Sequence, residues 1–207
     1  MSDQQIVVYS DYVCPFCYLG RESLDRYQAD REHTLEIDWR PFDLRSGQRR
    51  SDGTIDHSVD TGKDESYFEQ AKENVRRLQE KYDVAMDLEI ARDIDSLPAQ
   101  VVAYHLKTAV DYETWLAFDE AVFEALWQDG RDIGDEDVLV DVATSVGVDA
   151  ETVRAALDDE ELRSEVREQF EAAQQQGVTG VPTFAYDGYA ARGAVPPEQL
   201  QRLVEGR

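Results

Sequence analysis

The chain of 207 residues contains two cysteines, Cys14 and Cys17, which are separated only by Pro15 and Phe16. They follow a short apolar, β-favouring run and open a stretch with helical spacing that extends from 14 to about 30. The first turn of a helix has unpaired backbone N–H groups and partial positive charge, which favour a thiolate placed there. A C-x-x-C pair at a strand-to-helix junction therefore predicts redox chemistry.

The place of each cysteine in the helix indicates its role. Cys14 stands at the helix start and is the better nucleophile, whereas Cys17, one turn later, is the more buried, resolving thiol. Pro15 suits an early helical position and stiffens the turn. In the expected reaction Cys14 attacks a disulfide, a mixed disulfide forms, and Cys17 releases the product. In the reverse reaction the same two cysteines oxidise a dithiol. The sequence does not determine whether reduction or oxidation of the substrate prevails.

Two other interpretations of the cysteines remain. A zinc site needs about four ligands, but His33, His57 and His105 lie far apart without ligand spacing. The cysteines could also be an incidental core pair, because cysteine is among the most buried residue types. We expect no metal site.

A proline near the C-terminus is the second candidate feature. Pro182, in the segment Gly177–Phe184, stands at the entrance of a predicted strand, where it cannot donate a ladder hydrogen bond. A cis bond there would expose the preceding backbone for docking of a substrate chain, and a plain trans proline at a strand edge is the alternative.

The hydrophobic periodicity predicts an α/β fold with a large all-helical insertion, and the C-x-x-C pair in its β-α-β unit indicates the thioredoxin-like class. The expected strands are 5–10, 34–44, 183–186 and 189–192, and the expected helices are 14–30, 66–82, 96–109, 113–128, 135–146, 149–157, 159–176 and 196–204. Residues 1–44 and 177–207 together form the thioredoxin-like domain, and 66–176 form the inserted helical subdomain.

The segment 45–65 is polar, lacks periodicity and is predicted to be a long mobile loop. Its Arg45, Arg49 and Arg50 form the densest positive group in the chain and could steer an anionic thiol such as glutathione toward Cys14. A solvated connection without such a role is the alternative.

Asp11 and Tyr12, just before the first cysteine, are further candidates for steering the substrate. The Asp11 carboxylate could also tune proton transfer at the thiols.

The charge is strongly negative, with 21 basic and 45 acidic residues and a net charge of −24. We interpret this balance as adaptation to a very salty cytoplasm, the alternative being an ordinary acidic protein. Nucleic acid and anionic membranes are excluded as partners, because both require a basic patch. The polar first residues and the absence of an 18-residue apolar run predict a cytoplasmic protein, where reductase or isomerase work is more plausible than net oxidation.

Three motifs resemble the DsbA-like thioredoxin-fold family, and in particular its cytoplasmic FrnE-like branch. They are Ser10–Cys17, Trp39–Leu44, and Gly177–Phe184 with Gly193–Pro196 beyond it. The resemblance spans the whole chain. It implies that Pro182 is cis and, with Val181, faces the active disulfide.

The related hydroxychromene-carboxylate isomerases and kappa-class glutathione transferases usually carry Ser at the position of Cys14. Having both cysteines favours dithiol chemistry, with protein or small-molecule thiols and disulfides as partners and no tightly bound cofactor. Glutathione is a possible co-substrate. Phe16, where many relatives have Trp, and Val195, where many have Gln, depart from the pattern. A glutathione-dependent transferase or isomerase and a non-catalytic redox-sensing module remain as rival functions.

Overall fold

The structure, a computed structural model, describes residues 5–62, 64–87 and 93–206. Its strands are β1 (Gln5–Ser10), β2 (Glu36–Pro41), β3 (Thr183–Tyr186) and β4 (Tyr189–Arg192). Its helices are α1 (Pro15–Ala29), the 3-10 turn η1 (Ser46–Gln48), α2 (Glu65–Tyr82), α3 (Leu97–Ala109), α4 (Tyr112–Trp127), α5 (Glu136–Ser145), α6 (Ala150–Asp158), α7 (Glu160–Gln175) and α8 (Pro197–Glu205). The predicted order of elements is confirmed, with boundaries shifted by a few residues.

The strands form one mixed sheet in the order β2-β1-β3-β4. β1 pairs in parallel with β2, and the crossover between them is α1, as a parallel pair requires. β3 lies antiparallel on the other side of β1, so that Val8 stands between Trp39 and Phe184. The N-terminal and C-terminal parts of the chain therefore build one sheet, which is the thioredoxin-like arrangement predicted.

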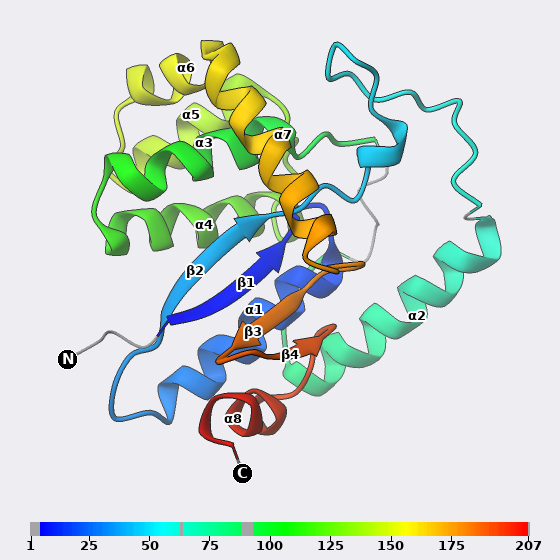
Figure 1. The fold of residues 1–207 in the computed structure, drawn as a ribbon, viewed down its shortest axis with the longest axis vertical. Coiled ribbons are helices and arrows are strands. Elements are labelled where there is room, and N and C mark those ends of the chain that lie inside the picture. The colour runs from blue at the N-terminus through cyan, green and yellow to red at the C-terminus, as the bar shows by residue number, and fades with distance from the viewer. Residues whose placement is uncertain (1–4, 63, 88–92, 207) are drawn as a thin grey trace.

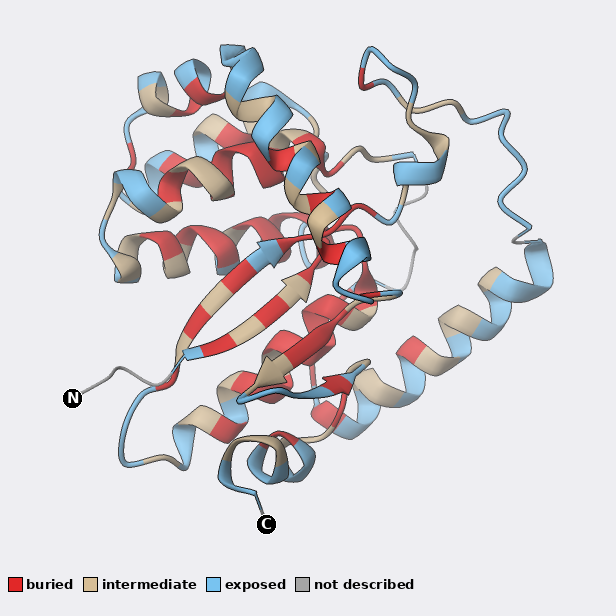
Figure 2. Cartoon of the chain, viewed as in Figure 1, coloured by how far each residue is buried: buried red, intermediate tan, exposed pale blue. Residues whose placement is uncertain are grey.

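The alternation of side chains along β1 explains how both faces of the sheet are covered. Ile6 and Val8 join the core that includes Leu24 of α1, whereas Val7 and Tyr9 face the other side, where α7 lies. Helix α1 lies behind the sheet and packs against α8, which also contacts β3 and β4, and α7 crosses in front of the sheet (Figure 1). Strand β1 is consequently sandwiched between helices (Figure 2).

The helical insertion shares its core with the sheet domain. Phe123 of α4 packs edge-on against Tyr12, with ring centroids 4.8 Å apart, and stacks on Tyr18 of α1 at 5.8 Å. Trp127, at the end of α4, donates from its indole N–H to the backbone carbonyl of Tyr12 at 2.9 Å. The insertion is thus packed directly against the turn that carries the cysteines.

The segment predicted to be an irregular loop contains local structure. It holds the turn η1 and a single bridge between Arg49 and Ile55, and α2 begins one residue earlier than expected, at Glu65. Asp64 caps α2 by accepting from the backbone N–H of Tyr67 at 3.0 Å. Beyond this cap α2 is exposed along most of its length and contacts α1 (Figure 2).

Candidate active site

The two cysteines lie at the junction of β1 and α1. Cys14 is the last residue before α1 and has an extended backbone, with φ −95° and ψ 111°. Its carbonyl accepts the backbone N–H of Cys17 at 2.9 Å, so both cysteines share the first helical turn. Both are free thiols. Pro15 is buried in the first turn, as expected, and Phe16 is half-buried against the core.

Both thiols are buried, and for Cys17 this burial has a clear effect on protonation. Cys14 is 4% and Cys17 2% exposed, so the expected difference in burial between them is small. Burial raises the pKa of Cys17 well above its ordinary value, and the neighbouring Cys14 raises it further. Cys17 is therefore held as a neutral thiol, which suits a residue that acts second.

The loop that contains Val181 and Pro182, called the proline loop below, lies directly beside Cys14. The peptide bond between Val181 and Pro182 is cis, as the resemblance implies. The Cys14 sulfur approaches the Val181 carbonyl oxygen at 3.6 Å, in the geometry of a thiol donating a hydrogen bond. Residues 167 positions apart in sequence thus form one site, with a backbone carbonyl next to a sulfur.

Asp11, predicted as a candidate for substrate steering, is turned into the protein and has no exposed surface. Its side chain is fully buried and accepts from the backbone N–H groups of Val13 at 3.2 Å and Leu44 at 2.9 Å. It also accepts from the Ser96 hydroxyl at 2.6 Å. Burial, together with the nearby Asp43 carboxylate, raises the pKa of Asp11 to about 6.

Tyr12, the other candidate for substrate steering in this turn, also points inward. It is fully buried, stacks on Trp39 at 5.9 Å between centroids, and donates from its hydroxyl to Asp119 at 2.9 Å. Burial and this neighbouring carboxylate hold the pKa of Tyr12 well above its ordinary value. The residue anchors the cysteine turn to β2 and α4.

The three arginines do not form one exposed positive group. The side chain of Arg49 is 7% exposed and makes ion pairs with Asp43 at 2.6 Å and with Asp95 at 2.8 Å. Arg45 is half-buried, and burial lowers its pKa. Only Arg50 is exposed, 3.2 Å from Asp56. Arg49 is turned inward because the buried Asp43 and the half-buried Asp95 both pair with its guanidinium.

Sequence reasoning missed the residues of the insertion that support the cysteine turn. Ser96 has the residue type and position of a helix cap, yet its side chain makes no cap hydrogen bond and instead binds Asp11. Gln100, one turn further along α3, donates to the Phe42 carbonyl at 3.2 Å and to Ser96 at 3.1 Å. A buried glutamine in an apolar helix was the available signal, because buried polar groups require partners.

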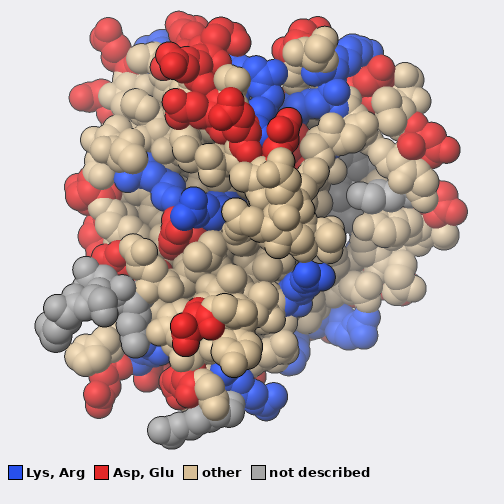
Figure 3. All heavy atoms as spheres, viewed as in Figure 1, with Lys and Arg blue, Asp and Glu red and all other residues tan. Residues whose placement is uncertain are grey.

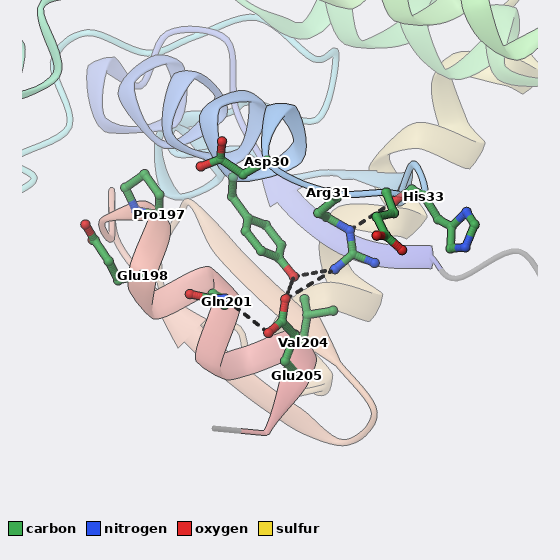
Figure 4. A pocket seen from close by; sticks show the side chains of 10 residues that line it. Asp30, Arg31, His33, Pro197, Glu198, Gln201, Val204 and Glu205 are labelled. Carbon is green, nitrogen blue, oxygen red and sulfur yellow. Dashed lines mark hydrogen bonds and ion pairs between the residues drawn. The ribbon is translucent and has the colours of Figure 1, made fainter.

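One hollow in the surface is remote from the cysteines. It has a volume of about 560 Å³ and lies between the end of α1 and α8 (Figure 4). Tyr27, Arg31 and Glu205 interact with one another across it, and no cysteine lines it. His33 lies at its rim, and within the described residues no group of His, Cys, Asp and Glu side chains could hold a metal ion.

Figure 3 shows acidic side chains mainly at the top and along the two sides of the face in view, around a centre made mostly of other residues. They gather over α6 and α7, and the basic side chains form small separate groups between them (Figure 3). Among the helices of the described chain, none is long and apolar enough to cross a membrane.

Comparison with known proteins gives a matching family model, one related protein and two similar solved structures. The model of the DSBA-like thioredoxin domain matches residues 5–205. YwbO of Bacillus subtilis, an uncharacterised protein, is 26% identical over 96% of this chain and 94% of its own length. A protein from Streptomyces coelicolor, described as a probable DsbA oxidoreductase, is 26% identical with a TM-score of 0.76, covering 98% of this chain and 90% of that one. The cytosolic disulfide reductase DsbM of Pseudomonas aeruginosa, solved with glutathione, shares 18% identity and a TM-score of 0.64 over 96% of this chain and 92% of its own.

Proposed function

The chain belongs to the DSBA-like thioredoxin domain family, and from this premise we propose that it is a thiol–disulfide oxidoreductase working through Cys14 and Cys17. One observation carries the proposal: two free thiols share the first turn of α1, with the Val181 carbonyl 3.6 Å from the Cys14 sulfur. No other cluster in the described residues combines a nucleophile with a partner able to resolve a covalent intermediate.

The proposed reaction consists of two thiol–disulfide exchange steps. The Cys14 thiolate attacks one sulfur of a substrate disulfide, whose S–S bond breaks and whose other sulfur leaves as a thiolate and takes up a proton. Cys17 then loses its proton and attacks Cys14, which expels the second substrate thiol. The substrate is reduced to two thiols, and the cysteine pair is oxidised to a disulfide. The raised pKa of Cys17 keeps this second thiol protonated until the mixed disulfide forms.

We propose that the protein acts as a reductase or isomerase in a cytoplasm, as a member of the FrnE-like branch adapted to high salt. The branch assignment is supported by its three sequence motifs, and the salt adaptation by the net charge of −24. A small thiol must then reduce the Cys14–Cys17 disulfide after each turnover. Glutathione is our candidate, supported by the glutathione complex of the similarly folded DsbM.

The protein substrate is proposed to dock as an extended segment against the proline loop. The backbone of Val181 borders the Cys14 sulfur, and main-chain groups beside a nucleophile recognise a peptide without demanding one side chain. Arg50, the exposed member of the three arginines, remains a candidate for attracting an anionic thiol.

A trapping experiment tests the function. The variant Cys17→Ser, incubated with glutathione disulfide, is expected to retain one glutathione on Cys14 in intact-mass spectrometry, and the Cys14→Ser variant to retain none. The wild-type protein should catalyse reduction of insulin disulfides by glutathione.

Two outcomes would favour the rival functions. Conjugation of a chromogenic electrophile to glutathione that persists in Cys17→Ser would indicate a transferase. A reversible disulfide in the wild-type protein without turnover of any disulfide substrate would indicate a redox-sensing module.

A further inference from the structure

The Asp11 carboxylate joins the cysteine turn to the helical insertion. On the turn side, one carboxylate oxygen accepts the backbone N–H of Val13, and the Asp11 carbonyl accepts the N–H of Cys14 at 3.0 Å. On the insertion side, the same oxygen accepts the Ser96 hydroxyl at 2.6 Å and the Gln100 amide at 3.4 Å. The charge of a single residue is therefore bonded to both parts of the fold.

The charge of Asp11 acts on the Cys17 thiol. Burial and Cys14 are the larger causes of the raised pKa of Cys17. Asp11 acts on it in two opposite ways: a hydrogen bond from the Asp11 backbone lowers this pKa, and repulsion by the Asp11 carboxylate raises it. Two interacting charged groups affect each other's titration. Residues that hold the Asp11 carboxylate in place or change its protonation therefore also change the pKa of Cys17.

The two donors from the insertion are both buried beside Asp11. Ser96 is 1% and Gln100 0% exposed. The Ser96 side chain does not cap α3, and Gln100 donates both to it and to the Phe42 carbonyl. Hydrogen bonds from neutral donors to a buried carboxylate favour its ionised form.

The remaining charged groups around Asp11 come from the segment after β2 and the start of the insertion. The Asp43 carboxylate opposes ionisation of Asp11, and the half-buried Arg45 favours it. Arg49 is paired with Asp43 and Asp95, so its charge is largely balanced by these two carboxylates. Tyr12, the other neighbouring titratable side chain, is held neutral by burial and Asp119.

We propose that Ser96 and Gln100, at the start of α3, are positioning residues for the redox pair: they hold the Asp11 carboxylate in place and so set when Cys17 releases its proton. This inference rests on the proposed function, and it gives the insertion a part in the chemistry in addition to packing. The residues act through Asp11 and do not touch the sulfurs.

The pH dependence of thiol alkylation provides the test. In a Cys14→Ser background, the logarithm of the Cys17 alkylation rate by iodoacetamide should rise with pH, flatten near pH 6 as Asp11 ionises, and then rise again. Adding Ser96→Ala removes a donor to the carboxylate, so the flat region should move upward by about one pH unit. Ser96→Thr, which retains the hydroxyl, should restore its position, and Gln100→Met should shift it in the same direction as Ser96→Ala.

The control is Ser23→Ala, which removes another fully buried hydroxyl with a 2.6 Å hydrogen bond, in that case to the Val195 carbonyl. It should leave the flat region unchanged even if it lowers stability. A Ser96→Ala profile identical to that of the parent, or a parent profile with no flat region, would overturn the inference. The measurement requires no turnover, so it is separate from the trapping experiment: a protein that fails to trap glutathione but shows the shift loses only the proposed function.

Discussion

Gly20 of α1 faces Pro182 so closely that a Cβ built on the glycine would lie 2.9 Å from the proline Cγ. The same Cβ would lie 3.1 Å from the ring of Phe184. This contact is where the helix that carries the cysteines meets the proline loop, and it depends on the absence of a side chain at position 20.

Replacing Gly20 by Ala is therefore expected to destabilise the protein. In an open helix the change would stabilise by about 1 kcal/mol, but overpacking here costs about 1–3 kcal/mol, so the net effect should be a lower free energy of unfolding. Urea unfolding followed by circular dichroism measures it. Gly180→Ala is the matched control, because this glycine of the same loop has open space around its Cβ position and should be nearly neutral. A more stable Gly20→Ala would contradict the close packing.

The single-cysteine variants should differ in alkylation rate. At neutral pH, Cys17 in the Cys14→Ser variant should react with iodoacetamide more slowly than Cys14 in the Cys17→Ser variant, because burial holds the pKa of Cys17 well above its ordinary value. In denaturant the two rates should converge. A faster Cys17 in the folded protein would reverse the assigned roles.

Arg49 and Arg50 should differ sharply in their effect on stability, although they are adjacent. Arg49→Met removes the ion-pair partner of the buried Asp43 and should cost about 3–5 kcal/mol of unfolding free energy. Arg50→Met removes an exposed pair and should cost less than about 1 kcal/mol. Denaturant unfolding of both variants provides the comparison, and equal effects would show that the Arg49 network does not hold the segment in place.

Asp11 should make stability fall as the pH rises toward neutrality. Its pKa is about 6 in the folded protein against an ordinary 3.8, so the folded state binds the proton more tightly. The associated stability is complete below about pH 4 and is lost as the pH rises through 6, by at most about 3 kcal/mol. Asp11→Asn should flatten this part of the pH profile of unfolding free energy, whereas Asp129→Asn, at an exposed position, should leave it unchanged. An unaltered profile in Asp11→Asn would show that another group is responsible.

Salt should stabilise the protein. Its net charge of −24 repels itself over about 30 Å at 0.01 M salt but only about 3 Å at 1 M. The melting temperature in potassium chloride should therefore rise from low to molar concentration, beyond the rise given by sucrose as an uncharged osmolyte. A melting temperature that does not change across this range would remove the interpretation of the charge as salt adaptation.

The sequence alone determined the cysteine pair, its place between strand and helix, and the order of elements, because these depend on local spacing. Ile6 and Val8 alternate with Val7, and helical stripes recur every three to four residues, so the pattern is visible without knowing any distant partner. The sheet domain split around a helical insertion followed from the same periodicity.

Only the tertiary structure decided what the polar residues around the cysteines do. Asp11 and Ser96 are 85 positions apart, and no local pattern indicates that one accepts a hydrogen bond from the other. Charge also misleads, since Arg49 is typical of an exposed loop until Asp43 and Asp95 are seen to surround it. A polar side chain is buried or exposed according to whether the fold brings it a partner, and that partner is chosen by packing between distant segments rather than by neighbours in the chain.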